Sequence, residues 1–109
     1  MSKDYRLYLE DILGSIRKIE KYISGLTYDT FIQDGLIVDG VIRNLEIIGE
    51  AAKHIPLSIR KIHHLIEWKK ITGLRDILIH EYSGVNLKII WDIVVTKVPE
   101  LKAALAKVK

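Results

Sequence analysis

Apolar residues recur at intervals of three and four along most of this chain, and that spacing constrains the fold more strictly than any other feature. The first run places six apolar side chains on one stripe and predicts a helix over residues 2–24: Tyr5, Leu9, Ile12, Ile16, Ile19 and Ile23. Gly25 would end this helix, and Thr27 would cap a second helix that ends before Pro56. No segment of the sequence shows the alternating pattern of a strand.

The second predicted helix carries a longer apolar stripe and two other distinctive sets of residues. Arg43, Glu46 and Glu50 lie three and four positions apart, so they share a polar face. Small residues would let another helix approach closely: Gly40, Gly49, Ala51 and Ala52. The stripe itself predicts the buried face of this helix: Phe31, Val38, Val41, Leu45, Ile48, Ala52 and Ile55.

The rest of the chain continues the helical pattern. Ser58 would cap a short helix that ends at residue 63 or 64, and a further periodic run predicts a helix over residues 68–82. Asn86 would cap the last helix, and Pro99 should kink that helix or open a new turn. Short loops between these helices predict an all-α antiparallel bundle of four or five helices.

The composition agrees with a single cytoplasmic domain over residues 1–109. Hydrophobic residues make up 49% of the chain and charged residues 28%, which is typical of a globular protein. The chain has no Cys, which excludes disulfide frameworks and thiol catalysis and favours a reducing compartment. Its apolar runs are too short to span a bilayer, so we expect no membrane partner. A formal net charge of +3 slightly favours a polyanionic partner.

A polar cluster near the end of the predicted helix over residues 68–82 could carry chemistry. Asp76 and His80 are four apart and share a face, so the carboxylate could orient the imidazole. Arg75 and Tyr82 are seven apart and nearly eclipsed, whereas Arg75 and His80 point about 140° apart on an ideal helix. The same residues could equally be surface charges, with His80 as a cation that suits the helix C-terminus.

Three blocks in this order resemble the HepT-like branch of the HEPN superfamily, and the resemblance covers nearly the whole chain. The first block is residues 43–52. The second runs from Trp68 through residues 75–82, where Arg, four residues, His, one residue and Tyr match the family motif. The third is the turn at Asn86 that leads to Trp91, where the family more often has Asp at the cap. The resemblance implies a HEPN bundle that forms a homodimer.

The resemblance also implies a function. It implies a metal-independent endoribonuclease that needs no cofactor and acts as the toxin of a toxin–antitoxin pair, with RNA as substrate and a minimal nucleotidyltransferase as antitoxin. Arg75 and His80 take the positions of the catalytic pair, and Asp76 takes the supporting polar position. Tyr82 takes the position that the antitoxin modifies with AMP. The residue types suit this reaction, because His can move protons near neutral pH and Arg can stabilise a developing phosphorane.

Other residues leave alternatives open. Arg43, Lys69 and Lys70 could contact the RNA backbone, and a basic strip toward Arg75 could also include residues 53, 60 and 61, but such a strip is as easily a solvated face. Three of the four His lie in the same stretch, but adjacent His on a helix diverge by about 100° and no third ligand is evident, so we expect no metal site. The alternative function is a non-catalytic HEPN subunit that binds nucleotide or presents substrate to a separate nucleotidyltransferase.

Overall fold

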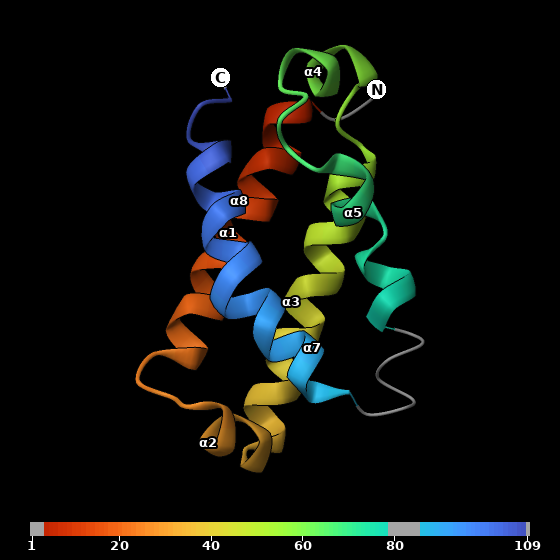
Figure 1. The fold of residues 1–109 in the computed structure, drawn as a ribbon. Helices are drawn as coiled ribbons and strands as arrows, with labels where there is room; N and C mark the ends of the chain where they lie inside the picture. The colour runs from red at the N-terminus through yellow and green to blue at the C-terminus, as the bar shows by residue number, and fades with distance from the viewer. Residues whose placement is uncertain (1–3, 79–85, 109) are drawn as a thin grey trace.

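The computed structural model describes residues 4–78 and 86–108, and both ranges are helical without any strand. Residues 74–78 are also helical. Figure 1 shows the arrangement of the elements, in chain order α1 (Tyr5–Ile23), α2 (Tyr28–Gln33), α3 (Gly35–Lys53), α4 (Leu57–Ile62), α5 (Trp68–Thr72), α7 (Leu87–Asp92), the π-helix η1 (Ile93–Lys97) and α8 (Val98–Leu105). The all-α prediction is confirmed for the described ranges.

The long elements lie side by side along the long axis of the molecule. Helix α1 packs against α3, α8 packs against α1, and α5 packs against α3. The described part measures 41 × 27 × 27 Å along its principal axes. No helix within these two ranges is both long and apolar enough to cross a membrane.

The two predicted stripes form the core between these helices. All seven residues of the second stripe are buried, and so are four of the six in the first. Phe31 of α2 is fully buried and its ring lies 5.0 Å from that of Trp91, measured between centroids, so the last helices close over the same core. Burying each large apolar side chain contributes about 1.5–3 kcal/mol to the free energy of folding, so these stripes are a major source of stability.

The helix predicted from Thr27 to Pro56 is wrong as a single element. Its first part is α2, capped reciprocally by Thr27 and Thr30. Asp34 then leaves the helical conformation, and its carboxylate accepts a hydrogen bond of 3.1 Å from the backbone N–H of Ile37 at the start of α3. A carboxylate that caps a following helix competes with continuing the preceding one, which explains the break.

Two other helix boundaries differ from the predictions, and a third is confirmed. The short fourth helix begins at Leu57 with Pro56 as its N-cap residue, so Ser58 is not the cap. The helix predicted over residues 68–82 is interrupted at Gly73, which ends α5 before residues 74–78 resume the helix. The Asn86 cap is confirmed, because its side chain accepts a hydrogen bond from the N–H of Ile89.

The predicted effect of Pro99 is confirmed in the last helical rod. The chain forms the π-helix η1 and then starts α8 at Val98, with Pro99 in the first turn of α8. Pro has no N–H to bond to the carbonyl four residues earlier, so the preceding turn widens and a new helix begins where that donor is not needed.

Gly49 sets the distance between α3 and the helical residues 74–78. A Cβ atom on Gly49 would lie 3.2 Å from the backbone oxygen of Ile71, 3.4 Å from Cβ of Leu74 and 3.7 Å from the backbone N of Arg75. The first two contacts are tight, and one of them is to backbone, so only glycine fits without a shift. The predicted close approach at a small residue is confirmed here, and it brings Arg75 beside α3.

A pair of Gly→Ala variants tests this contact. Gly14 lies inside α1 with open space where a Cβ would be, so Gly14→Ala should stabilise the protein by about 0.5–1 kcal/mol through helix propensity alone. Gly49→Ala gains the same propensity but forces Ile71 away, so it should lower the free energy of unfolding by about 1–2 kcal/mol. Urea denaturation measures both, and equal stabilisation by the two variants would contradict the tight contact.

Candidate functional site

A polar cavity of about 390 Å³ opens between α1, α3 and the helical residues 74–78. Its position follows from the fold, because α1 packs on α3 while Gly49 draws residues 74–78 toward the same stretch of α3. Arg75 lies at this cavity, and most of the other lining residues come from the polar face of α3. The lining consists of Tyr8, Asp11, Arg43, Glu46, Ile47, Glu50, Ala51, His54 and Arg75.

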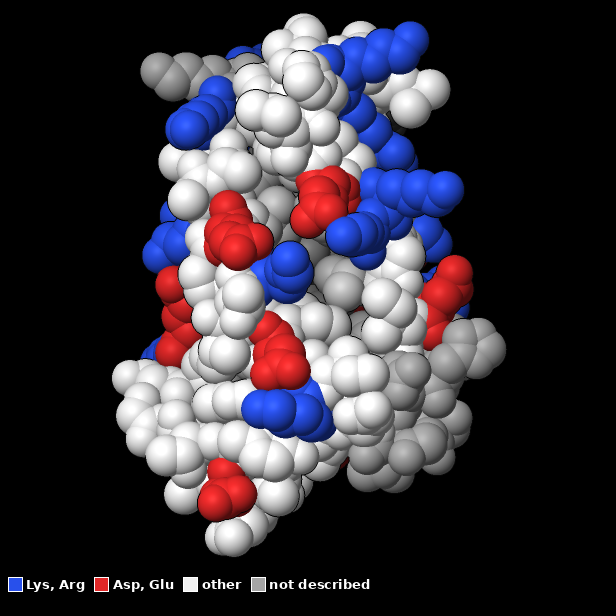
Figure 2. All heavy atoms as spheres, viewed as in Figure 1, with Lys and Arg blue, Asp and Glu red and all other residues white. Residues whose placement is uncertain are grey.

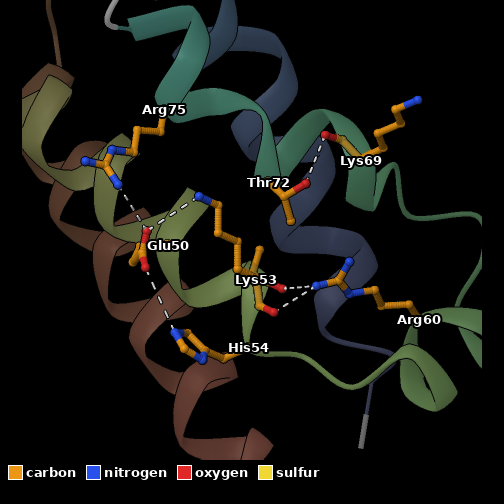
Figure 3. A network of polar contacts seen from close by, with 8 residues as sticks. Glu50, Lys53, His54, Arg60, Lys69, Thr72 and Arg75 are labelled. Carbon is orange, nitrogen blue, oxygen red and sulfur yellow. Dashed lines mark hydrogen bonds and ion pairs between the residues drawn. The ribbon is translucent and has the colours of Figure 1, made fainter.

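Glu50 is the acidic centre on which three basic side chains converge (Figure 3). Its carboxylate oxygens lie 3.9 Å from Nη1 of Arg75, 3.8 Å from Nζ of Lys53 and 4.0 Å from Nε2 of His54. The contacts to Arg75 and Lys53 are long, half-exposed ion pairs, each contributing at most about 1 kcal/mol in water, and the His54 contact is an ion pair only when the imidazole carries a proton. The Arg75 side chain is 58% exposed. Glu50 therefore orients the guanidinium of Arg75 without occupying its donors tightly.

An aromatic pair forms another part of the cavity wall. The rings of Tyr8 and His54 stack with centroids 4.6 Å apart and planes 12° apart. Tyr8 comes from α1, and His54 is the residue that ends α3. Neither was singled out as a site residue by the sequence analysis. For His54 a signal existed, because it lies four positions after Glu50 and so extends the polar face of α3.

Arg43 joins Arg75 at the same cavity. Its Nη1 lies 3.7 Å from the carboxylate of Glu46, and the Arg43 side chain is largely exposed whereas that of Glu46 is half-buried. Arg43 and Glu46, which the sequence places on one polar face, form an ion pair, and both line this cavity. Two guanidinium groups thus share one hollow with the carboxylates of Asp11, Glu46 and Glu50.

Lys69 and Lys70 lie elsewhere, on α5, beside a different cavity of about 640 Å³. The ammonium of Lys70 lies 2.7 Å from the carboxylate of Glu67. This hydrogen-bonded contact raises the pKa of Lys70 and lowers the pKa of the Glu67 carboxyl group. The side chain of Lys69 points away from the Glu50 network (Figure 3). Lys69 and Lys70 therefore do not share the cavity that Arg43 and Arg75 line.

Arg60, one of the residues that a basic strip could have included, is engaged with the backbone. Its guanidinium donates hydrogen bonds of 2.9 Å to the carbonyls of Ile55 and Ala52, and one of 3.1 Å to that of Lys53. The carbonyls of Ala52 and Lys53 belong to the last turn of α3, where a cation also suits the helix dipole, and Ile55 lies two residues beyond the helix. The guanidinium of Arg60 thus caps the C-terminal end of α3. Acidic and basic side chains are interspersed across the face shown in Figure 2.

The remaining predicted residues can be placed only in part. Asp76 is exposed on the helical residues 74–78 and does not line the cavity of Arg75. His80 and Tyr82 lie outside the residues that the structure describes, so the predicted pairing of Asp76 with His80 stays a prediction. Across residues 4–78 and 86–108, no three His, Asp or Glu side chains gather in a way that could hold a metal ion.

Comparisons with known proteins place this chain in a family. The family described as "Ribonuclease HepT-like" matches residues 12–108. A relative from Caldanaerobacter subterraneus subsp. tengcongensis, named as an RNase, is 42% identical over 92% of this chain and 89% of its own length. A relative from Thermococcus cleftensis, named as a ribonuclease HepT, is 38% identical over 100% of this chain and 99% of its own length.

A further relative has a second activity in its name. The protein from Methanocaldococcus jannaschii is named as a gamma-glutamylcyclotransferase and RNase, and it is 43% identical over 99% of this chain, which spans 49% of that protein. No solved structure matches the chain significantly. The family match over nearly the whole chain agrees with the all-helical fold and with the resemblance in the sequence. The chain belongs to the HepT-like ribonuclease family.

Proposed function

We propose that this chain is an endoribonuclease that cleaves RNA without a metal ion, with Arg75 and His80 as its catalytic pair. Membership of a ribonuclease family supports RNA cleavage in general. The observation that carries the proposal is the half-exposed guanidinium of Arg75 at a polar cavity that has a second guanidinium on its lining. A phosphodiester held in that cavity could accept hydrogen bonds from the guanidinium groups of Arg75 and Arg43.

The proposed reaction is an internal transesterification. His80 accepts the proton of the ribose 2′-hydroxyl, whose oxygen attacks the adjacent phosphorus while the bond to the 5′-oxygen breaks. A protonated His80, on this chain or on a second one, gives the leaving oxygen its proton. Arg75 holds the phosphate and stabilises the extra negative charge of the phosphorane. The products are a 2′,3′-cyclic phosphate and a 5′-hydroxyl end.

Neighbouring residues have supporting roles in this proposal. Asp76 orients the imidazole of His80, and Arg43 holds a phosphate next to the one that reacts. Lys69 and Lys70, which lie beside the other cavity, contact only more distant parts of a long RNA. A homodimer that brings two such sites together stays a prediction, and light scattering on the purified chain tests it.

Cleavage of a defined RNA in the presence of EDTA tests the catalytic proposal. The wild type should remain active, and His80→Ala should slow cleavage by about 10²–10⁴-fold, because a general acid–base group is lost. Arg75→Ala should slow it by about 10²–10³-fold, with partial recovery in Arg75→Lys. Arg17→Ala, the same change on the exposed side of α1, is the matched control and should cleave like the wild type. Cleavage that requires added metal, or that survives His80→Ala, would overturn the mechanism.

We propose further that the chain is the toxin of a toxin–antitoxin pair and that Tyr82 is its off-switch. The support is the resemblance of residues 75–82 to the family motif. A nucleotidyltransferase antitoxin would transfer AMP from ATP to the Tyr82 hydroxyl, releasing pyrophosphate. Each AMP adds a phosphodiester charge seven residues from Arg75, where it would compete with RNA for the guanidinium. Modification would therefore stop cleavage.

Mass spectrometry tests this switch. After incubation with the nucleotidyltransferase encoded beside it, ATP and magnesium, the chain should gain AMP on Tyr82 and lose RNA cleavage. Tyr82→Phe should gain none and should stay toxic in cells that express both proteins. Tyr28→Phe makes the same change on α2, away from the Arg75 cavity, and should be modified and silenced normally. Normal silencing of Tyr82→Phe, or AMP on another residue, would refute the assignment.

The alternative is a non-catalytic subunit that binds nucleotide or presents substrate to the nucleotidyltransferase. The presence of both Arg75 and His80 favours the enzyme over this alternative, since a presenting subunit needs no proton-transfer group. The two functions differ in one simple observation. A toxin arrests growth when it is expressed alone, whereas a presenting subunit does not.

A further inference from the structure

The stacked pair of Tyr8 and His54 lines the Arg75 cavity, and the proposed reaction makes no use of it. The ring of Tyr8 covers one face of the imidazole, yet the His54 side chain remains 51% exposed. Both residues share the cavity with Arg75 and Arg43. A flat aromatic surface beside groups that bind phosphate is the arrangement on which proteins stack unpaired nucleobases.

The cavity also contains groups that can read the edge of a base. Asp11, Glu46 and Glu50 contribute three carboxylates to the same lining. Carboxylates accept hydrogen bonds and donate none, so they favour a partner that presents N–H groups. Adenine, cytosine and guanine each carry an exocyclic amino group. Uracil instead presents its one ring N–H between two carbonyl oxygens, which the carboxylates repel.

The charge and size of the cavity further restrict which class of ligand fits it. Two guanidinium groups and three carboxylates leave no excess of positive charge, so a bare polyanion such as a polyphosphate is disfavoured. A nucleotide within RNA has one phosphodiester charge, which suits the guanidinium groups, and a base with N–H donors, which suits the carboxylates. A volume of about 390 Å³ also lies within the usual range for small-ligand sites, roughly 300–1,000 Å³.

We propose that this cavity is a nucleoside subsite, which holds one unpaired base beside the phosphate bound by Arg75. The base stacks on the exposed face of His54 and directs its amino group toward the carboxylates of Asp11, Glu46 and Glu50. The subsite therefore selects a nucleotide with an exocyclic amino group over uridine next to the cleaved bond. This inference rests on the proposed ribonuclease function and adds a base preference to it.

Binding of short RNAs that cannot be cleaved tests the subsite without relying on catalysis. Single-stranded oligonucleotides with 2′-fluoro groups throughout are titrated with protein, and fluorescence anisotropy gives the Kd. His54→Ala should raise the Kd by about tenfold or more, because one stacked base is lost. His54→Phe keeps a flat ring and should stay within about threefold of the wild type. His64→Ala, an exposed histidine at the other cavity, is the matched control and should bind normally.

A second arm uses oligonucleotides in which one nucleotide at a time lacks its base. The loss caused by His54→Ala should disappear when the missing base is the one that occupies the subsite, and should persist when any other base is missing. Replacing that base with uracil should weaken binding to the wild type. A His54→Ala protein that binds every oligonucleotide like the wild type, or no single position that abolishes the effect, would overturn the subsite.

The outcome separates this inference from the proposed function. If the His54 effect maps to one base but RNA is never cleaved, the subsite stands and the catalytic proposal fails. If RNA is cleaved in EDTA but the His54 variants bind alike at every position, the ribonuclease stands and the subsite fails.

Discussion

The tight contact at Gly49 is the constraint on which the functional region depends. The backbone of residues 71–75 crosses α3 at a point where even a methyl group would meet the carbonyl oxygen of Ile71 at 3.2 Å. The next residue of α3 is Glu50, whose carboxylate lies 3.9 Å from the guanidinium of Arg75. Without that closeness, Arg75 would be an ordinary surface cation. With it, Arg75 shares a cavity with the polar face of α3 and the aromatic ring of Tyr8 on α1.

The ion pairs in this cavity are long and partly exposed to solvent. The ion pair between Glu50 and Arg75 is 3.9 Å long and half exposed, so it contributes little to holding the guanidinium in place. A phosphodiester offers shorter, charge-assisted hydrogen bonds to the same guanidinium. On the face shown in Figure 2, basic side chains are interspersed with acidic ones. Lys70 is paired with Glu67, and Arg60 is hydrogen-bonded to backbone carbonyls. RNA recognition in this account therefore relies on a few local contacts, not on a broad basic surface.

Much of the fold could be predicted from the sequence, because the helical stripes report directly which faces are buried. The second stripe is buried at all seven positions. The breaks at Asp34 and Gly73 were missed because a continuing apolar period hides a local change of backbone direction. The role of Arg60 could not be predicted for another reason, since a periodic pattern does not show that the chain after α3 turns back and brings a guanidinium to the last carbonyls of that helix.

Residues of the candidate site that share one helix could be predicted from the sequence, whereas contacts between residues of different helices could not. The spacing from Arg43 to Glu50 showed a polar face, and the family motif drew attention to Arg75. Pairing Tyr8 with His54 requires knowing how α1 lies on α3, which depends on the whole core. Sequence alone gives the composition of each face, whereas the meeting of two faces is a property of the packed structure.

The central claim is that RNA reacts at the Arg75 cavity. A crystal structure of His80→Ala with an uncleavable single-stranded RNA tests it most directly. The account predicts a phosphate oxygen within hydrogen-bond distance of the Arg75 guanidinium, with the adjoining base inside the cavity that Tyr8 and His54 line. An RNA bound along α4 and α5 instead, with the Arg75 guanidinium still facing only Glu50, would contradict it.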